Sequence, residues 1–292
     1  MKLTLPDKSI RDLENGSTGF DLANDIGPGL AKAAVAVTVD GVQRDLHDPI
    51  MHDANISIIT IDSEEGLEIM RHTLAAQVLA RAVKNLYPKS KLAIGPTIKD
   101  GFYYDVECKE TISIDDLKKI EKEMDKIVKT KSSITKKLLS KKDALKVFKD
   151  KDESYKEEII NDSDQKDQFQ LYYQDDEDFV DLCKGPHLPN LNFIGAYKLT
   201  TISGAYWKGD SSNTMLTRIY GTAWSNEKDL NEHLNNIEEA QKRDHRKLGK
   251  EMDLFHFQDE APGMVFWHPN GWSIYRNLRN FVRKRLQEND YI

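Results

Sequence analysis

The spacing of apolar residues predicts a small unit of strands and one interrupted helix over residues 1–63. Residues 19–34 are expected to be helical, with a break at the Gly-Pro-Gly run 27–29. The Asp40-Gly41 dipeptide is typical of a hairpin turn. The expected strands are residues 2–5, 8–12, 35–39 and 56–61. A βαβ-like unit of about 60 residues is near the lower size limit for independent folding.

The pattern then predicts a longer unit that mixes helices with strands. An amphipathic helix is expected over residues 66–86, because its apolar positions recur at helical spacing until it stops before Pro88. Two more helices are expected over residues 115–130 and 142–150. The expected strands are residues 92–94, 102–106, 169–173, 179–183, 196–205 and 216–224.

The remaining residues predict a connector and the beginning of another unit. Residues 227–250 are expected to form one long polar helix, whose thin apolar stripe is typical of a connector. A strand over 264–268, a turn over 269–271 and a helix from Trp272 should follow. We expect residues 251–292 to be too few to build a core of their own.

Composition narrows the class of protein. A length of 292 residues suggests roughly two domains. The mean hydropathy is -0.63, and no apolar run approaches the 18 or more residues of a membrane span. The first residues lack the apolar segment of a secretory signal, and the cysteines are only Cys108 and Cys183. These features predict a cytoplasmic, reducing environment and no membrane partner.

Charge is distributed in blocks. The net charge of -7 argues against a protein that coats nucleic acid indiscriminately. Lysines are dense over residues 118–151, and acidic residues are dense over 152–181, with a maximum at 175–178. Basic residues return at 242–247 and 276–285. Such blocks are usually solvated helix faces, but they also suit a specific RNA or DNA partner held at a few phosphates.

A split group of reactive side chains is the main candidate site. His72 lies on the predicted helix 66–86, and Asp181, Cys183 and His187 follow far downstream around a Gly-Pro turn. Cysteine and histidine can bind a metal, act as nucleophiles or hold a water molecule. The alternative is that these residues have no chemical role, with the thiol buried in the core and the two imidazoles at the surface. The spacing alone leaves both interpretations open.

Several stretches of the chain resemble the bacterial threonyl-tRNA synthetase family, in that family's order and spacing. The stretches are residues 92–96 (LAIGP), 100–105 (DGFYYD), 183–187 (CKGPH), 203–210 (SGAYWKGD), 218–224 (RIYGTAW), 242–247 (KRDHRK) and 261–268 (APGMVFWH). The resemblance implies four parts. They are a ubiquitin-like β-grasp TGS domain at 1–63, an α+β editing domain with an antiparallel sheet at 64–226, a linker helix at 227–250, and the truncated start of a class II catalytic domain at 251–292.

The resemblance also implies an activity. The family activates threonine with ATP and transfers it to tRNA(Thr), and its editing domain hydrolyses seryl-tRNA(Thr) made in error. A second site is needed because the methyl group that separates threonine from serine supplies only about 1–3 kcal/mol of discrimination. The complete enzyme is expected to be a homodimer whose catalytic domain uses ATP, Mg²⁺ and Zn²⁺. This chain, which lacks most of that domain, should need no cofactor and should not join threonine to tRNA.

Site residues follow from the same resemblance. The family's editing site corresponds here to the catalytic candidates His72, Lys156, Asp181, Cys183 and His187, with Tyr103 near the substrate. Lys156 would steady the carbonyl oxygen, and Asp181 would orient an imidazole or bind the amino group. Cys183 and His187 would hold the water or the ribose hydroxyl. Taken alone, Lys156 would be interpreted as a surface lysine. The tRNA-binding candidates are Lys242, Arg243, Arg246 and Lys247.

One position departs from the family pattern. The family has a second histidine four residues after the first, but this chain has Ala76 there, followed by Gln77 on another helix face. A four-ligand metal site like that of related alanyl editing domains would therefore lose a ligand. His72, Cys183 and His187 could still make a three-ligand site, but the resemblance implies no metal. The alternatives for the chain are a free-standing deacylase and a non-catalytic tRNA-binding module.

Overall fold

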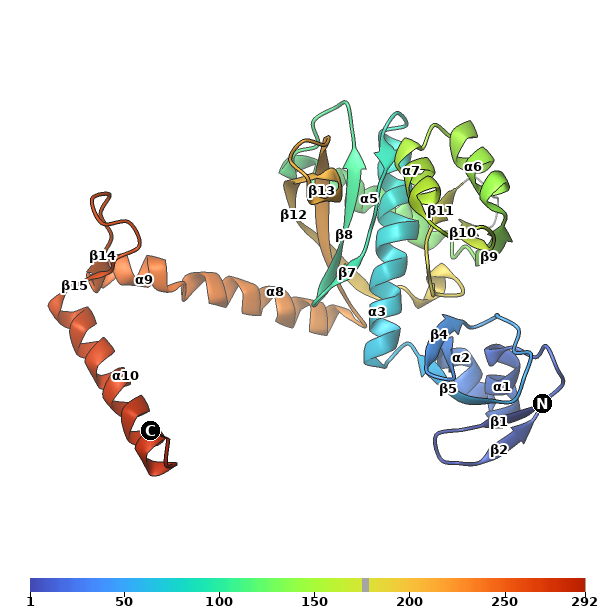
Figure 1. Ribbon diagram of the computed structural model, residues 1–292, viewed down its shortest axis with the longest axis horizontal. Coiled ribbons are helices and arrows are strands. Elements are labelled where there is room, and N and C mark those ends of the chain that lie inside the picture. The colour runs from blue at the N-terminus through green and yellow to red at the C-terminus, as the bar shows by residue number, and fades with distance from the viewer. Residues whose placement is uncertain (175–178, 292) are drawn as a thin grey trace. The chain divides into compact units, whose positions relative to one another are not determined.

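The computed structural model describes residues 1–174 and 179–291, and its elements are labelled in Figure 1. The chain divides into two compact units, Met1–Leu230 and Asn231–Ile292. The most acidic stretch of the sequence, residues 175–178, lies outside the described residues. Among the described residues, no helix is both long enough and apolar enough to cross a membrane.

The first part of the larger unit is a mixed five-stranded sheet in the order β2-β1-β5-β3-β4. Its strands are β1 (Lys2–Thr4), β2 (Ile10–Asp12), β3 (Ala34–Val39), β4 (Val42–Asp45) and β5 (Ala54–Thr60), and its helices are α1 (Gly19–Ile26) and α2 (Pro28–Ala33). β1 and β5 are parallel, and the other pairs are antiparallel. Leu3, Leu22 and Val37 fill its core. The expected hairpin and helix break are both present.

A long helical run crosses the middle of the larger unit. It consists of α3 (Glu64–Thr73), the π-helical segment η1 (Leu74–Leu79) and α4 (Ala80–Leu86). In Figure 1 it stands between the β8–β13–β12 sheet and the layer of α6, α7 and β9–β11. Ser63 caps its first turn, since the Ser63 hydroxyl accepts the Gly66 N–H at 3.0 Å. The predicted helix is confirmed, but the π-helical segment, a feature frequent at functional sites, has no signature in the apolar spacing.

One antiparallel sheet covers this helical run, with strands in the order β12-β13-β8-β6. The strands are β6 (Lys91–Leu92), β7 (Thr97–Ile98), β8 (Gly101–Glu107), β12 (Ala196–Tyr206) and β13 (Met215–Trp224), and β7 pairs with β8. Helix α5 (Leu117–Lys129) buries one face against the same core, and short 3₁₀ turns occur at Ile114–Asp116, Leu191–Phe193 and Trp207–Gly209. The antiparallel sheet expected in this part is confirmed.

A second antiparallel sheet, in the order β11-β10-β9, carries the other half of the candidate site. Its strands are β9 (Ile134–Leu139), β10 (Phe169–Gln174) and β11 (Val180–Leu182), and its helices are α6 (Lys141–Asp150) and α7 (Ser154–Asp162). The sequence pattern did not predict β9 or α7. β9 is an edge strand in which the adjacent Lys136 and Lys137 interrupt the apolar alternation. α7 lies in the acidic block and has no side-chain cap at its first residue.

Two expectations for the end of the chain were wrong. The helix expected over 227–250 is two helices, α8 (Glu227–Lys242) and α9 (His245–Glu251). They separate because the Asp244 carboxylate accepts the Arg246 N–H at 2.8 Å and so caps a new helix. The turn expected at 269–271 is the first turn of α10 (Pro269–Glu288), with Pro269 in the position where a missing N–H costs nothing.

The smaller unit has only a two-stranded sheet, β14 (Phe255–His256) with β15 (Phe266–Trp267). Apolar side chains of α10 remain exposed, among them Ile274, Leu278 and Phe281 at 54%, 61% and 57%. Within the described residues, this unit therefore covers little of its own apolar surface, as expected from its size.

Gly66 determines how closely α3 approaches the first sheet. A Cβ atom at this position would lie 2.0 Å from the Thr60 carbonyl oxygen. We expect Gly66→Ala to destabilise the protein by about 1–3 kcal/mol in urea unfolding followed by circular dichroism, because backbone must move. Gly29→Ala is the matched control, since its Cβ would meet nothing within 4 Å. Equal unfolding midpoints for both variants would contradict this account.

Candidate functional site

The structure brings all five catalytic candidates together in the larger unit. His72 comes from α3 and Lys156 from α7, whereas Asp181 lies on β11 and Cys183 just after it. His187 follows the turn at Gly185, whose φ of 64° suits glycine. The site is therefore assembled by three segments that are separated by about 80 and 25 residues in the sequence.

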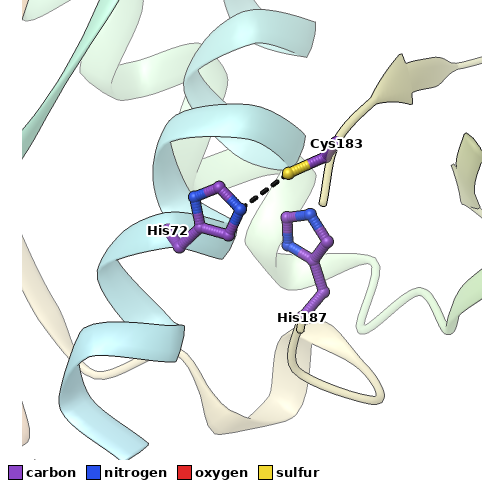
Figure 2. Close-up of side chains that lie close together, drawn as sticks. All are labelled: His72, Cys183 and His187. Carbon is purple, nitrogen blue, oxygen red and sulfur yellow. Dashed lines mark hydrogen bonds between the residues drawn. The ribbon is translucent and has the colours of Figure 1, made fainter. Parts of the chain in front are cut away.

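His72, Cys183 and His187 form one cluster, shown in Figure 2. His72 Nε2 lies 2.7 Å from Cys183 Sγ. The rings of His72 and His187 stack, with centroids 4.6 Å apart and planes 12° from parallel. His187 is only 2% exposed. Burial lowers the pKa of His72, and the nearby Asp181 carboxylate opposes this effect only in part. His72 is therefore a neutral imidazole at pH 7, able to accept a proton.

A hydroxyl group on α3 determines the tautomer of His187. Thr73 Oγ1 donates its one proton to the Ile69 carbonyl at 2.8 Å and accepts the Leu188 N–H at 3.0 Å. Its contact with His187 Nδ1, at 3.1 Å, must therefore be a hydrogen bond that Nδ1–H donates. In the neutral ring, Nε2 then carries a lone pair, and this buried atom has no hydrogen-bond partner among the described residues.

A buried charge pair forms the second group of the site. Lys156 Nζ lies 2.5 Å from Asp181 Oδ1, and both side chains are almost fully buried. The Tyr104 hydroxyl donates to Asp181 Oδ2 at 2.9 Å and accepts from Lys156 Nζ at 3.1 Å. Burial and the Asp181 charge raise the pKa of Tyr104 well above its ordinary value, so the hydroxyl stays protonated. The interpretation of Lys156 as a surface lysine is wrong.

Tyr103 does not join these groups. Its ring lies against the Arg218 guanidinium, 3.9 Å from the ring centroid, and beside Tyr220. Successive residues of a strand face opposite sides, and β8 turns Tyr104 toward the site instead. The buried alternation of Phe102, Tyr104 and Val106 in the sequence could have identified Tyr104.

Four of the five candidates, from both groups, line a single cavity of about 460 Å³, whereas His187 lines a second cavity of about 420 Å³. His72 and Cys183 lie on the wall of the first cavity together with Lys156 and Asp181. The remaining lining residues are Ala76, Ile94, Gly95, Pro96, Ile159, Ser163, Gln165, Gln168, Phe169, Gln170, Leu182, Lys184 and Gly185. Ala76 thus faces the cavity as expected, whereas Gln77 does not line it and is fully buried beside Gln174.

The His72–Cys183–His187 cluster is the one group of potential metal ligands found in the described part of the chain, with ligand atoms within 4.8 Å of one another. Its geometry is that of a hydrogen bond. A nitrogen and a sulfur that share a tetrahedral zinc ion should be about 3.5 Å apart, but His72 Nε2 and Cys183 Sγ are 2.7 Å apart. Binding zinc would require the two side chains to separate.

The four tRNA-binding candidates are exposed, and each lies near an acidic neighbour. Lys242 pairs with Glu238 at 2.9 Å, and Arg246 pairs with Asp244 at 2.7 Å. Arg243 and Lys247 have partners at 3.3 and 3.9 Å. Exposed pairs of this kind are weak, so the side chains can be redirected to a phosphate at little cost.

The lowered pKa of His72 can be measured directly. In a ¹³C-labelled protein, we expect the His72 imidazole signal, assigned with His72→Gln, to titrate with a midpoint below the ordinary value of 6.5. The sign follows from burial, which disfavours the charged ring, so the neutral form persists as the pH falls toward 6. A midpoint at or above 6.5 would contradict the burial argument.

Metal dependence can be tested on the same protein. We expect chelator dialysis to leave the thermal unfolding temperature unchanged and the protein free of stoichiometric zinc, because the cluster is closed by the His72–Cys183 contact. Zinc retained at one equivalent in wild type and in Cys108→Ala, but lost in Cys183→Ala, would refute this expectation.

Comparisons with known proteins agree with this architecture. Residues 1–60 match the family described as the TGS domain, and residues 170–220 match the threonyl and alanyl tRNA synthetase second additional domain. The chain is 50% identical over 289 residues to the threonine–tRNA ligase of Prochlorococcus marinus (strain MIT 9211), covering 99% of this chain and 45% of the relative. It is 47% identical to that of Psychrobacter cryohalolentis and 49% identical to that of Hahella chejuensis, again over 289 residues.

The chain spans less than half the length of these relatives. Both matched domains lie in the larger unit, which also holds the cavity and its charged residues. The chain therefore carries the two matched domains, and 99% of its length is similar to the N-terminal portion of threonine–tRNA ligases.

Proposed function

We propose that this chain hydrolyses seryl-tRNA(Thr) in the cavity lined by His72, Cys183, Lys156 and Asp181. The observation that carries the proposal is the pairing of a neutral imidazole with a buried ammonium group on one cavity wall. Ester hydrolysis needs a base for the attacking water and a positive group for the oxygen that becomes charged. Both requirements are met within one site.

In the proposed reaction, His72 accepts a proton from the water whose oxygen attacks the ester carbonyl carbon. Lys156 stabilises the negative charge on the carbonyl oxygen, and Asp181 and Tyr104 hold its ammonium group in place. The bond between the carbonyl carbon and the ribose oxygen then breaks, the ribose oxygen takes up the proton that His72 accepted, and serine is released. Cys183 keeps His72 oriented, and the Nε2 lone pair of His187 accepts a hydrogen bond from the water or a ribose hydroxyl.

The need for a second, hydrolytic site follows from how weakly one binding pocket can discriminate serine from threonine. A pocket built for threonine cannot refuse the smaller serine, because one methyl group is worth about 1–3 kcal/mol. A second cavity that hydrolyses the seryl ester faster than the threonyl ester supplies the missing accuracy. The cavity therefore has to select against the methyl group by its shape, and its walls include the apolar side chains of Ala76, Ile94, Ile159, Phe169 and Leu182.

We further propose the wider role that the relatives' names imply. The complete protein would join threonine to tRNA(Thr) with ATP, using Mg²⁺ and Zn²⁺ in a class II domain, and would act as a cytoplasmic homodimer. Lys242, Arg243, Arg246 and Lys247 would contact tRNA phosphates. The proposed parts are residues 1–63 (TGS), 64–226 (editing), 227–250 (linker) and 251–292 (start of the catalytic domain).

A non-catalytic tRNA-binding module is the competing function, and Ala76 is the observation that favours it. Ala76 lines the cavity where the family has a histidine. A second imidazole would add one or two hydrogen bonds to water or ribose, each worth about 0.5–1.5 kcal/mol. The free-standing deacylase would carry out the same hydrolysis, so only a longer sequence separates it from a ligase.

Deacylation of purified seryl-tRNA(Thr) tests the proposal. We expect hydrolysis above the uncatalysed rate, a loss of about 100-fold in His72→Ala because the base is removed, and a smaller loss in Cys183→Ala. Ala76→His should raise the rate about tenfold, the factor that corresponds to 1.4 kcal/mol.

Cys108→Ala is the matched control, because Cys108 lies outside the cavity lining. An inactive wild type that still binds tRNA, together with a silent Ala76→His, would favour the tRNA-binding module instead.

A further inference from the structure

A carboxylate of the first sheet reaches the loop that carries His187. Asp45 is the last residue of β4. Its Oδ1 accepts the His187 backbone N–H at 2.8 Å, and its Oδ2 accepts the Tyr172 hydroxyl at 2.7 Å. Lys136 Nζ lies 2.8 Å from the same Oδ2. One side chain from the TGS domain therefore contacts a backbone amide, a phenol and an ammonium group of the editing domain.

These contacts are shielded from water. The Asp45 and Lys136 side chains are 15% and 16% exposed. Burial lowers the pKa of Lys136, but the hydrogen bonds that its ammonium group donates to Asp45 and Asp48 outweigh burial and leave the pKa above its ordinary value. The ammonium group thus stays charged at neutral pH. Hydrogen bonds to a charged acceptor are about twice as strong as neutral ones, so the Asp45 carboxylate holds its partners firmly.

Tyr172 connects Asp45 to the ring of His187, because its hydroxyl bonds to Asp45 and its ring packs against the imidazole. The two rings meet edge to face, with centroids 4.3 Å apart and planes 70° from parallel. The Tyr172 hydroxyl also occupies the space that a side chain at Gly185 would need, since a Cβ there would lie 2.0 Å from it. Tyr172 is therefore packed against both ends of the turn that leads into His187.

We propose that Asp45 is a positioning residue for the His187 imidazole. Asp45 holds the His187 backbone and the Tyr172 ring from one side, and Thr73 holds Nδ1 from the other. Together they keep the His187 ring stacked on the His72 ring, with Nε2 unprotonated. The effect on catalysis rests on the proposed hydrolysis. The TGS domain then helps to position a residue of the editing site, although none of the TGS residues lines the catalytic cavity.

The alternative is a purely structural ion pair between the two domains. Asp48 provides a matched control, because it also pairs with Lys136, at 2.5 Å. Among the described contacts, Asp48 makes none to the His187 amide or the Tyr172 hydroxyl. If only the ion pair matters, Asp45→Asn and Asp48→Asn should behave alike.

The first experiment measures deacylation of seryl-tRNA(Thr) in the full chain. We expect Asp45→Asn to lower kcat about tenfold with KM unchanged, whereas Asp48→Asn stays within twofold of wild type. Thermal unfolding of both variants checks that each is folded. Wild-type kcat in Asp45→Asn, or equal losses in the two variants, would overturn the positioning role.

The second experiment does not depend on activity. In ¹⁵N-labelled protein, the His187 ring of wild type should show a protonated Nδ1 and an unprotonated Nε2. Because Thr73 still holds Nδ1, we expect the ring signals to shift and broaden in Asp45→Asn as the ring loses its fixed position, and the wild-type pattern in Asp48→Asn. A wild type that hydrolyses nothing would reject the proposed function, while this spectrum still decides the role of Asp45: an unchanged His187 signal in Asp45→Asn would overturn it.

Discussion

The burial of the helical run α3–η1–α4 is the constraint on which the larger unit depends. Most residues from Ile69 to Val83 are shielded from solvent, so the run needs cover on every side. Two antiparallel sheets and α5 supply it, and burial of this apolar surface is the main stabilising contribution. Polar groups on such a helix are costly unless each finds a partner. Arg71 Nε reaches the Ala223 carbonyl at 3.0 Å, and Thr73 makes three hydrogen bonds.

The same constraint explains why the reactive side chains lie together at one point. His72 lies where the buried helix meets the loop from Cys183 to His187, and Cys183 is the side chain that partners it. The buried Lys156–Asp181 pair contributes little to stability, because the free energy lost when two charges leave water often exceeds the gain from their attraction. Buried ionisable groups on a cavity wall are characteristic of functional sites. Stability alone gives no reason for them.

The elements that the sequence predicted well are those with strong local patterns. The helix over 66–86 and the strands of the β12–β13–β8 sheet have regular apolar spacing, and the helix break at residues 27–29 has its glycines and proline. The failures have equally local causes. α7 carries few apolar residues, β9 carries lysines, and Asp244 divides a polar helix by capping its successor. Element boundaries depend on single capping contacts, which periodicity does not contain.

By itself, the sequence determined the classes of structure and the membership of most of the site. The order of motifs identified the editing family, and five of the six residues expected in the catalytic cluster meet in space. Only the tertiary structure decided which tyrosine takes part, that Lys156 is buried, and that Asp45 reaches His187 from another domain. The physical reason is that spacing along the chain encodes which face of an element is apolar. The charge, tautomer and orientation of a side chain depend instead on neighbours that packing brings from distant segments.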